Sequence, residues 1–269
     1  MTSRARLVPA LLAALLLAPA CDSSKKVLTP EEAAAKLQTD LERADTLVRN
    51  DKLGEAETIY QRVLEHDDPG NAQALAGMGR VRFDEKKYAE AEQYLIEAVT
   101  KKGDDATLYY TIGQVQQLAG EPAKAAQSYG KAYELSPDDS NYGLAYGRML
   151  KDTEQFAEAE TVLREVSKLD PKAQFVFTEL GDALRGQEKL DESLRTYMKA
   201  QTTYPSNKEA FAGAALVYEA QGDNRHALDQ WSTYIRMDCC SDFSKKVAQM
   251  KVESLEVDHG DDEVVLEDE

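Results

Sequence analysis

The sequence has few of the side chains that most often hold metals or attack substrates. It contains three histidines, three cysteines and one tryptophan in 269 residues. His66, His226 and His259 show no paired spacing, and no C-x-x-C or H-E-x-x-H motif is present. G-x-S-x-G and phosphate-binding glycine loops are also missing. We therefore predict no metal, no cofactor, no catalytic residues and no small-molecule substrate, which excludes most enzyme classes.

Basic residues are scarce relative to acidic ones. Lys and Arg number 32 against 49 Asp and Glu, which gives a formal net charge of −17. A nucleic-acid site needs a Lys/Arg surface to neutralise phosphates, and an anionic membrane surface makes the same demand. The composition argues against nucleic-acid partners and against direct binding of the folded part to a membrane.

Long hydrophobic runs are missing as well. The apolar run at residues 11–18 has eight residues, whereas a helix that spans a membrane needs about 20. Arg4 and Arg6 precede the run, and no acidic residue occurs before Asp22. A basic start, a short apolar core and small residues at the exit predict a signal peptide over residues 1–20.

The exit of this segment, Leu17-Ala18-Pro19-Ala20-Cys21, resembles a bacterial lipobox. The resemblance implies that Cys21 is acylated and anchors the mature chain to a membrane, with residues 21–28 as lipidated Cys and polar tether. Ala18-Pro19-Ala20 also fits an ordinary A-x-A cleavage site, which would release a soluble protein. By resemblance, Asp22 would retain a lipoprotein at the inner membrane. The expected location is the bacterial cell envelope facing the periplasm, with inner and outer membrane both open.

What the sequence does have is a fixed period of 34 residues, the mark of a solenoid. Small residues recur at this spacing in two series: Gly79, Gly113, Gly147, Gly181 and Ala215, and Ala91, Ala125, Ala159, Ser193 and Ala227. A typical period, residues 106–139, reads as two short amphipathic helices with a break at Gly120–Glu121–Pro122. The small residues are expected to let the two helices approach closely. Ala56 takes the same place as the second series in the first repeat, and large residues four positions after these six are expected to fill the space between repeats: Tyr60, Leu95, Tyr129, Leu163, Tyr197 and Trp231.

The pattern resembles the tetratricopeptide repeat (TPR) family over roughly three quarters of the chain. The aligned repeats are about 37–70, 72–105, 106–139, 140–173, 174–207 and 208–241, with one extra residue at Asp67-Asp68-Pro69. The resemblance implies an all-α fold, a right-handed α-solenoid over residues 29–241. Pro137, Pro171 and Pro205 are expected to end second helices of repeats.

The ends of the array need their own elements, since a repeat array must be capped. Thr29-Pro30-Glu31-Glu32 predicts a capping box and a leading helix over residues 29–50. Residues 242–256 are expected to form a capping helix with Phe243, Val247, Met250 and Leu255 on one stripe. Residues 257–269 are acidic without Lys or Arg, which predicts a disordered solvating tail, or alternatively a docking element.

In the TPR family the first helices of the repeats line a concave, ligand-binding surface. Positions 2, 5, 9 and 12 of these helices predict a partner-binding groove of Arg80, Phe83, Tyr110, Gln114, Gln117, Arg148, Lys151, Phe175 and Arg185. Arg and aromatic side chains dominate interface hot spots. The alternative is ordinary charge balancing of the basic residues against Asp152 and Asp182. Asp45, Glu209 and Glu219 occupy the same positions in the outer repeats.

Cys239 and Cys240 form a neighbouring thiol pair in a predicted turn. Three alternatives stay open: two buried thiols, a strained bridge between neighbours, or a link between two chains.

Together these features predict a non-enzymatic scaffold, an envelope lipoprotein that presents a TPR groove to an extended or helical segment of a protein partner. Its lipidation signal, six repeats and Asn141-Tyr142-Gly143 are weakly similar to the pilotin lipoproteins that help secretin assembly for type IV pili. The alternatives are an assembly factor for another envelope complex, for outer-membrane protein insertion or cytochrome maturation, or a soluble periplasmic thiol protein using Cys239 and Cys240.

Overall fold

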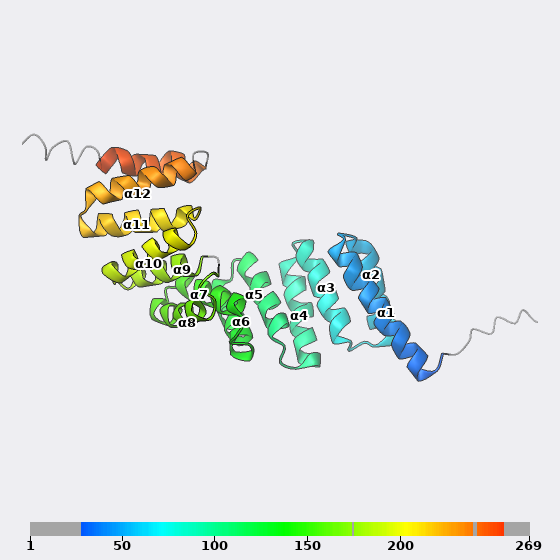
Figure 1. Cartoon of the computed structure of the whole chain (residues 1–269). Helices are drawn as coiled ribbons and strands as arrows, with labels where there is room; N and C mark the ends of the chain where they lie inside the picture. Colours follow the sequence, from blue (N-terminus) through cyan, green and yellow to red (C-terminus); the bar gives the residue numbers. More distant parts are fainter. Residues whose placement is uncertain (1–27, 174, 239–240, 256–269) are drawn as a thin grey trace, which may run out of the picture.

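The computed structural model of the chain describes residues 28–173, 175–238 and 241–255. In these ranges it has the twelve α-helices α1 to α12, a C-terminal helical segment at residues 242–255, two short π-helical turns and no strand (Figure 1). The helices follow one another in chain order along an elongated, curved stack, and its two ends lie far apart. The all-α repeat fold is therefore confirmed. Four predictions lie outside the described residues: the signal peptide, Cys21 as the lipid anchor, the Cys239–Cys240 pair and the tail at 257–269.

Six helix pairs form the stack. The first helices of the pairs are α1 (Pro30–Arg49), α3 (Ala72–Asp84), α5 (Ala106–Leu118), α7 (Ser140–Asp152), α9 (Val176–Gly186) and α11 (Lys208–Gln221). The second helices are α2 (Leu53–Arg62), α4 (Tyr88–Lys102), α6 (Pro122–Leu135), α8 (Phe156–Leu169), α10 (Leu190–Thr203) and α12 (Asn224–Met237). Helices α6, α8 and α10 each end two residues before the proline expected to stop them.

The capping box at the start of α1 is present in full. The Glu32 amide donates to the Thr29 hydroxyl over 3.2 Å, and the Thr29 amide donates to the Glu32 carboxylate over 2.9 Å. Pro30 occupies the first helical position, where its missing N–H costs nothing. These bonds satisfy donors that a helix start otherwise leaves unpaired.

The turn inside each pair uses a left-handed residue at the same point of the repeat. The φ angle is positive at Asp51, Lys86, Gly120, Glu154, Glu188 and Gly222. The amide after each of these residues donates back across the turn, as Lys189 does to the Leu184 carbonyl over 3.0 Å. This is the hydrogen bond of a Schellman helix ending, which glycine adopts most easily. Glycine fills only the third and sixth of the six positions.

The small residues of the period permit close helix contact within a pair. A Cβ added to Gly79, Gly113, Gly147 or Gly181 would lie 2.6–2.7 Å from the large side chain sixteen residues later. Tyr197 additionally reaches the next pair, because a Cβ on Gly213 would lie 2.3 Å from its ring. Large residues therefore pack against the small residue of their own repeat, and Tyr197 also fills the space to its successor.

The extra residue of the first repeat is absorbed at the end of α2. Residues there widen into the π-helical turn η1 (Val63–Asp67), and the Asp68 amide donates to the Val63 carbonyl over 2.7 Å. A π-turn accommodates one residue more than an α-turn without breaking the helix. The insertion therefore leaves the 34-residue frame of the following repeats undisturbed.

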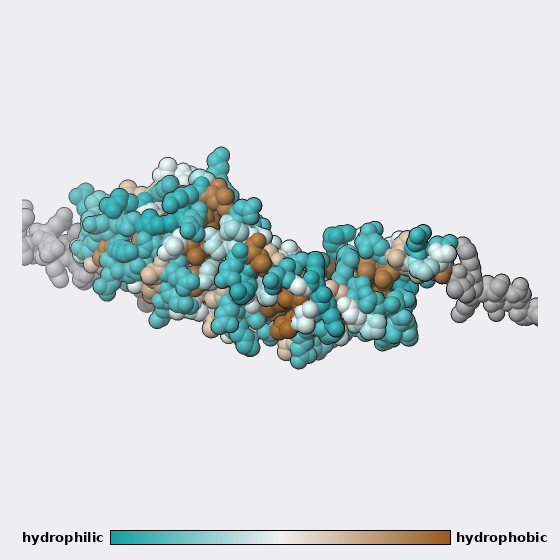
Figure 2. All heavy atoms as spheres, turned by 90° about the horizontal axis from the view of Figure 1, so that it is seen from below, coloured by the Kyte–Doolittle hydropathy of each residue, from teal (hydrophilic) through white to brown (hydrophobic). Residues whose placement is uncertain are grey.

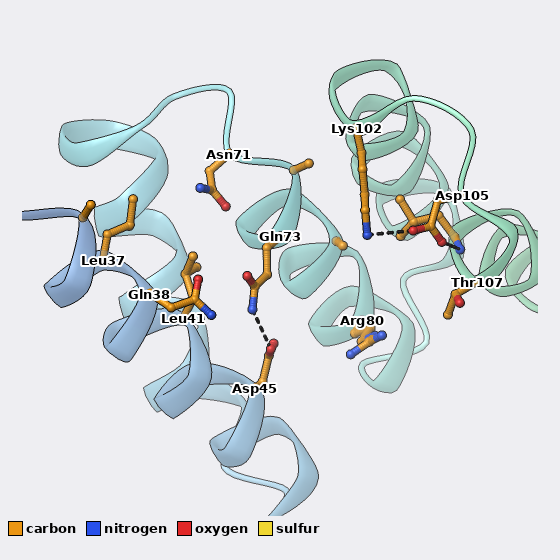
Figure 3. Close-up of a pocket in the computed structure, with 14 residues that line it drawn as sticks. Leu37, Gln38, Leu41, Asp45, Asn71, Gln73, Arg80, Lys102, Asp105 and Thr107 are labelled. Carbon is orange, nitrogen blue, oxygen red and sulfur yellow. Dashed lines mark hydrogen bonds and ion pairs between the residues drawn. The ribbon is translucent and has the colours of Figure 1, made fainter. Parts of the chain in front are cut away.

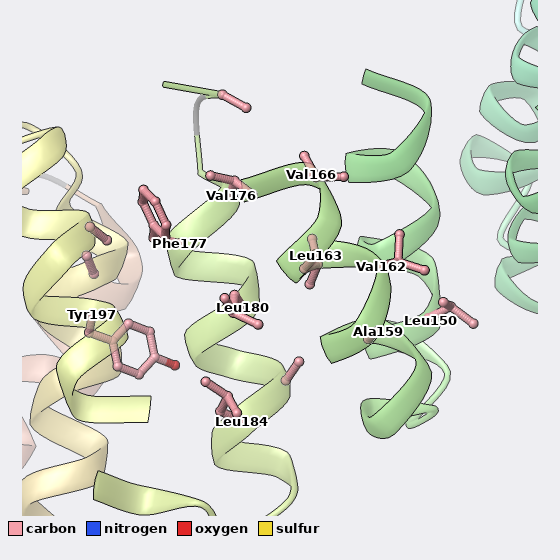
Figure 4. Packing of buried hydrophobic residues seen from close by; sticks show 14 of the residues in the cluster. Leu150, Ala159, Val162, Leu163, Val166, Val176, Phe177, Leu180, Leu184 and Tyr197 are labelled. Atoms are coloured by element: carbon pink, nitrogen blue, oxygen red, sulfur yellow. The ribbon is translucent and has the colours of Figure 1, made fainter. Parts of the chain in front are cut away.

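The core is a chain of local clusters that follows the stack. The largest cluster runs from Leu150 on α7 through α8 and α9 to Tyr197 on α10 and Val217 on α11 (Figure 4). Four further clusters lie among other neighbouring helices. Such a core gives each repeat contacts mainly with its neighbours, which is the stability arrangement of solenoids.

The C-terminal helical segment, residues 242–255, contains the π-turn η2 (Ser244–Ala248) and covers α12. Ala248 and Leu255 are buried in the cluster around Trp231. The predicted stripe is largely wrong as a packing face: Leu255 is buried, but Phe243, Val247 and Met250 are exposed. The π-turn changes the register along this segment, which a uniform 3.6-residue period does not anticipate.

Candidate functional site

A hollow of about 550 Å³ lies across the first helices of the first three repeats (Figure 3). Its walls come from α1, α3, the end of α4 and the start of α5. The lining includes Leu37, Gln38, Leu41, Asp45, Asn71, Gln73, Ala76, Arg80, Lys102, Asp105, Thr107 and Leu108. Gln38, Leu41, Asp45, Gln73, Ala76, Arg80 and Thr107 occupy positions 2, 5 or 9 of a repeat. Seven lining residues thus share the repeat positions used for the predicted groove, and Arg80 is the predicted groove residue among them.

Most polar groups of the hollow have internal hydrogen bonds or ion pairs. Asp45 accepts hydrogen bonds from Gln73 over 2.9 Å and from the Tyr60 hydroxyl over 2.6 Å. Lys102 forms an ion pair with Asp105 over 2.7 Å. These contacts fix the walls, and Leu37 with the lining alanines leaves apolar surface exposed between them, whereas Leu41 and Leu108 are buried.

Arg80 is the exception on this surface. It lines the hollow from α3 and is exposed, and its guanidinium forms no ion pair or hydrogen bond within the part of the chain that the structure describes. Its charge partly offsets the burial that raises the pKa of Asp84, but the five donors of its fixed fork make no hydrogen bond to a described residue and suit a carboxylate. Arg80 is therefore the one predicted groove residue placed in this hollow with its charge available.

The basic residues of the middle repeats are engaged internally. Arg148 and Lys151 on α7 bind the two carboxylate oxygens of Glu179 on α9 over 2.8 and 2.7 Å. Burial lowers the pKa of Lys151, but Glu179 and Asp182 outweigh it and raise the pKa above its ordinary value. Glu179 itself is only 8% exposed. Charge balancing accounts for these side chains, with Glu179 as the principal carboxylate.

Arg185 belongs to the same network through Asp182. It lies 3.5 Å from Asp182, which also accepts a hydrogen bond from the Tyr197 hydroxyl over 2.5 Å. Burial, followed by the charge of Asp182, raises the pKa of Tyr197 well above its usual range, so its hydroxyl stays protonated and donates. The network joins the fourth and fifth repeats, and it also holds the hydroxyl of the buried Tyr197 ring.

The predicted polar and aromatic residues of α5 form a second internal group. Tyr110 packs between the rings of Tyr129 and Tyr142, at centroid distances of 5.3 and 5.0 Å. Gln117 is exposed and accepts a hydrogen bond from the Tyr129 hydroxyl over 2.9 Å. Gln114 is half-buried on the same helix. Contacts within the array hold Tyr110 and Gln117 in place. Whether they contact a partner stays a prediction.

Two predicted aromatic residues are placed differently from expectation. Phe83 is half-buried and packs against the cluster around Leu95, with the Tyr88 ring at 6.2 Å. Phe175 lies just before α9 with φ at 69°, so its assignment to the second position of that helix is wrong. Helix α9 begins at Val176, two residues later in the repeat frame than its counterparts.

The far end of the array is closed by an ion pair from the C-terminal segment. Glu219 on α11 accepts a hydrogen bond from the Trp231 indole over 2.5 Å and pairs with Lys251 over 2.5 Å. Its acidic charge is therefore used to hold the cap. A ligand surface at this end would first have to break that contact.

Sequence reasoning missed the apolar part of the hollow. Leu37, Leu41 and Ala76 were not proposed, although two of them occupy the same repeat positions as the chosen polar residues. Applying the positions evenly, without selecting for charge and aromaticity, would have identified Leu41 and Ala76. Lys102 and Asp105 come from the turn between repeats, which the positional rule does not cover.

Other site types find no support in the described ranges. No group of three or more His, Cys, Asp or Glu residues there is placed to hold a metal ion. None of the helices in the same ranges is both long enough and apolar enough for a membrane span.

Models of the tetratricopeptide repeat match residues 41–107, 78–140 and 178–233, and a second model of this repeat matches residues 117–175. The chain is 25% identical over 129 residues to the general transcriptional corepressor ssn6 of Schizosaccharomyces pombe, covering 47% of this chain. It is 27% identical over 154 residues to the cellulose synthase operon protein C of Pseudomonas fluorescens, covering 54% of this chain. The matches span only 12% of the length of each of these relatives.

Two solved structures show the same fold. YrrB, described as a TPR protein with an unusual peptide-binding site, has a TM-score of 0.60 and 24% identity, and the match covers 64% of this chain and 89% of YrrB. Pseudomonas aeruginosa pilF has a TM-score of 0.62 and 15% identity, covering 84% of this chain and 99% of pilF. Since the repeat models match well over half of the sequence and the helix pairs follow the same period, the chain belongs to the tetratricopeptide repeat family.

Proposed function

We propose that this protein is a non-enzymatic adaptor that binds a segment of a protein partner in the hollow across repeats one to three. TPR arrays are scaffolds suited to protein–protein interaction, and YrrB carries a peptide-binding site on the same fold. The observation that carries the proposal is the combination of apolar lining and the free guanidinium of Arg80 in one concavity.

The chemistry of the hollow indicates the kind of segment. The partly exposed Leu37 side chain and the neighbouring alanines favour an aliphatic side chain, since apolar area removed from water stabilises a complex; Leu41 is buried in the wall behind them. Arg80 favours a carboxylate on the same segment. We therefore expect a peptide in which an Asp or Glu lies close to a Leu, Ile or Val.

A peptide-display selection tests this expectation on the purified protein. Random peptides selected on the wild type are expected to share an acidic residue near an aliphatic one, and to be lost on an Arg80→Glu variant. Arg195→Glu is the matched control, because Arg195 is exposed on α10, outside the hollow, and has no ion pair in the described ranges. Peptides that bind the Arg80→Glu protein as well as the wild type would contradict the proposal.

We further propose that the adaptor is lipid-anchored through Cys21 in a bacterial envelope, with a pilotin-like role in secretin assembly. Support comes from the lipobox-like residues 17–21, from the resemblance in repeat number, and from the pilF likeness, which extends over almost all of that chain. A crosslinked pull-down from envelopes distinguishes this role from assembly of another envelope complex. A secretin should be enriched by wild type and Arg195→Glu, and lost with Arg80→Glu. Enrichment of a different envelope complex with the same dependence would keep the adaptor and exclude the pilotin-like role.

A further inference from the structure

The C-terminal segment carries a stripe of three large apolar side chains that stay partly exposed in the described structure. Phe243 is 46% exposed, Val247 36% and Met250 59%, and their spacing of four and three residues is that of one helix face. The face of the array seen in Figure 2 is mainly hydrophilic, with several separate apolar patches along it. Three large neighbouring apolar side chains on one short segment are therefore unusual for this protein.

The stripe is not the face that caps the solenoid. Ala248 and Leu255 are at most 5% exposed and belong to the same buried cluster as Trp231 and Tyr234 on α12, and Ser244 is buried as well. Phe243 lies at the border between the two faces, with its ring 5.6 Å from that of Tyr234 and 6.4 Å from that of Trp231. The segment thus has two apolar faces: one packs against α12, and the other is exposed and available to bind another apolar segment.

Two unpaired cations flank the stripe. Lys245 and Lys246 are exposed, and neither ammonium group forms an ion pair with a residue of the described ranges. In a chain of net charge −17, a basic and apolar surface selects a ligand that combines apolar side chains with carboxylates.

The size of the stripe argues against a second copy as its cover. The exposed parts of three such side chains amount to on the order of 300 Å², whereas a standard interface buries about 800 Å² on each partner. A covalently attached segment needs much less contact, because its effective concentration is about millimolar and it does not lose the free translation of a separate molecule.

The chain contains such a segment directly after the stripe. Residues 256–269 include eight Asp and Glu, no Lys or Arg, and the apolar run Val264-Val265-Leu266. The eight residues between Leu255 and Val264 reach up to about 27 Å when extended. Val247 lies only about 12 Å back along the helix from Leu255.

From this complementarity we infer that residues 264–269 of the chain bind the stripe. Val264, Val265 and Leu266 cover Phe243, Val247 and Met250, and the carboxylates that follow lie beside Lys245 and Lys246. The C-terminal segment then completes the cap, and the apolar end of the array is closed to other partners. This inference concerns the opposite end of the array from the hollow, so neither proposal depends on the other.

Photo-crosslinking of the full chain tests the inference. The photoreactive residue p-benzoylphenylalanine replaces Val247, and mass spectrometry identifies the crosslinked peptide at low micromolar protein. The expected product is monomeric and joins position 247 to the peptide holding residues 264–269. The matched control carries the same photoreactive residue in place of Ile96, which is 49% exposed on α4 and should not reach that peptide.

Two double variants test separately the apolar contacts and the ion pairs between residues 264–269 and the stripe. Val264→Asp with Leu266→Asp should lower the intrachain yield on the order of tenfold, because two aliphatic contacts are lost. Lys245→Glu with Lys246→Glu should lower it as well, and added salt should weaken the wild-type yield but not that of the charge variant. Circular dichroism confirms that both variants keep their helices. A crosslinked dimer, a monomer without a crosslink to residues 264–269, or a yield unchanged by the Asp substitutions would overturn the inference.

Discussion

A methyl group added to Gly213 tests the packing between the fifth and sixth repeats. The Cβ of a Gly213→Ala variant would lie 2.3 Å from the Cε1 atom of Tyr197 and 2.4 Å from its Cζ atom. The Tyr197 ring has no room to move away. It is fully buried, it also packs closely against Gly181, and its hydroxyl donates a hydrogen bond to Asp182. Either α10 and α11 separate or the ring leaves its rotamer.

The magnitude follows from two opposing contributions. Overpacking of a close-packed core costs typically about 1–3 kcal/mol. Replacing Gly by Ala in a helix gains up to about 1 kcal/mol. Gly54→Ala is the matched control, because Gly54 lies in α2 and its added Cβ meets no atom within 4 Å. The difference between the two variants removes the helix gain and should be about 1–3 kcal/mol, with Gly213→Ala the less stable.

Urea unfolding followed by circular dichroism measures this difference. Since each repeat contacts mainly its neighbours, the damage should be greatest at one interface, and the unfolding transition of Gly213→Ala should broaden or split. The Gly54→Ala transition should keep its shape and move to slightly higher urea. If both variants gained equally, the close approach of Tyr197 to Gly213 would be refuted.

Four further predictions concern the turns, the charges and the anchor. Glu188→Gly should stabilise the fold by about 1 kcal/mol in urea unfolding, because it removes a left-handed non-glycine residue; a loss would contradict the φ of 59°. The Glu160 carboxylate is desolvated, which raises its pKa, but hydrogen bonds from Lys189, Arg164 and Gln187 outweigh this and lower the pKa to about 2. Its stabilisation is therefore complete above the unfolded pKa near 4.5 and is lost as pH falls towards 2, so Glu160→Gln should cost about 1–2 kcal/mol at pH 7 and little at pH 2. Arg148→Glu should lower the free energy of unfolding by about 2 kcal/mol or more, because it places a second carboxylate beside Glu179. Thermal melting measures the loss, and an unchanged melting temperature would contradict a stabilising role of the Arg148–Glu179 ion pair. Cys21→Ser should abolish metabolic labelling with a fatty acid, and labelling that persists would exclude Cys21 as the acceptor.

The repeat frame was predictable because helix contacts recur with the period. A glycine at one point of each repeat and a large residue sixteen positions later describe one contact, which the structure shows for Gly79, Gly113, Gly147 and Gly181. The leading helix was predictable for a local reason, since the capping box at Thr29 involves residues only three apart. The turn residues Lys86 and Glu188 carry no local signal, and they become visible only in register with Gly120 and Gly222.

The candidate site was only partly predictable. Arg80 lines the hollow, and its use for binding stays a prediction that depends on its having no hydrogen bond or ion pair with another described residue, which the sequence does not state. Arg148 and Lys151 looked equivalent to it, yet they are bound by Glu179 on the next first helix, about 30 residues away. A pairing across repeats depends on the rotation of one repeat against the next, and the same rotation decides which positions share a surface.

The sequence by itself determined that this protein is a capped array of six helix pairs, because the information for that fold is local and is repeated in each period. The tertiary structure alone decided that the hollow lies at repeats one to three. It also decided that the basic residues of the middle repeats form ion pairs with Glu179 and Asp182. Finally, it decided that Phe243, Val247 and Met250 of the last segment are exposed. Each depends on contacts between side chains distant in sequence, or on one π-turn that shifts the register, and a linear period contains neither.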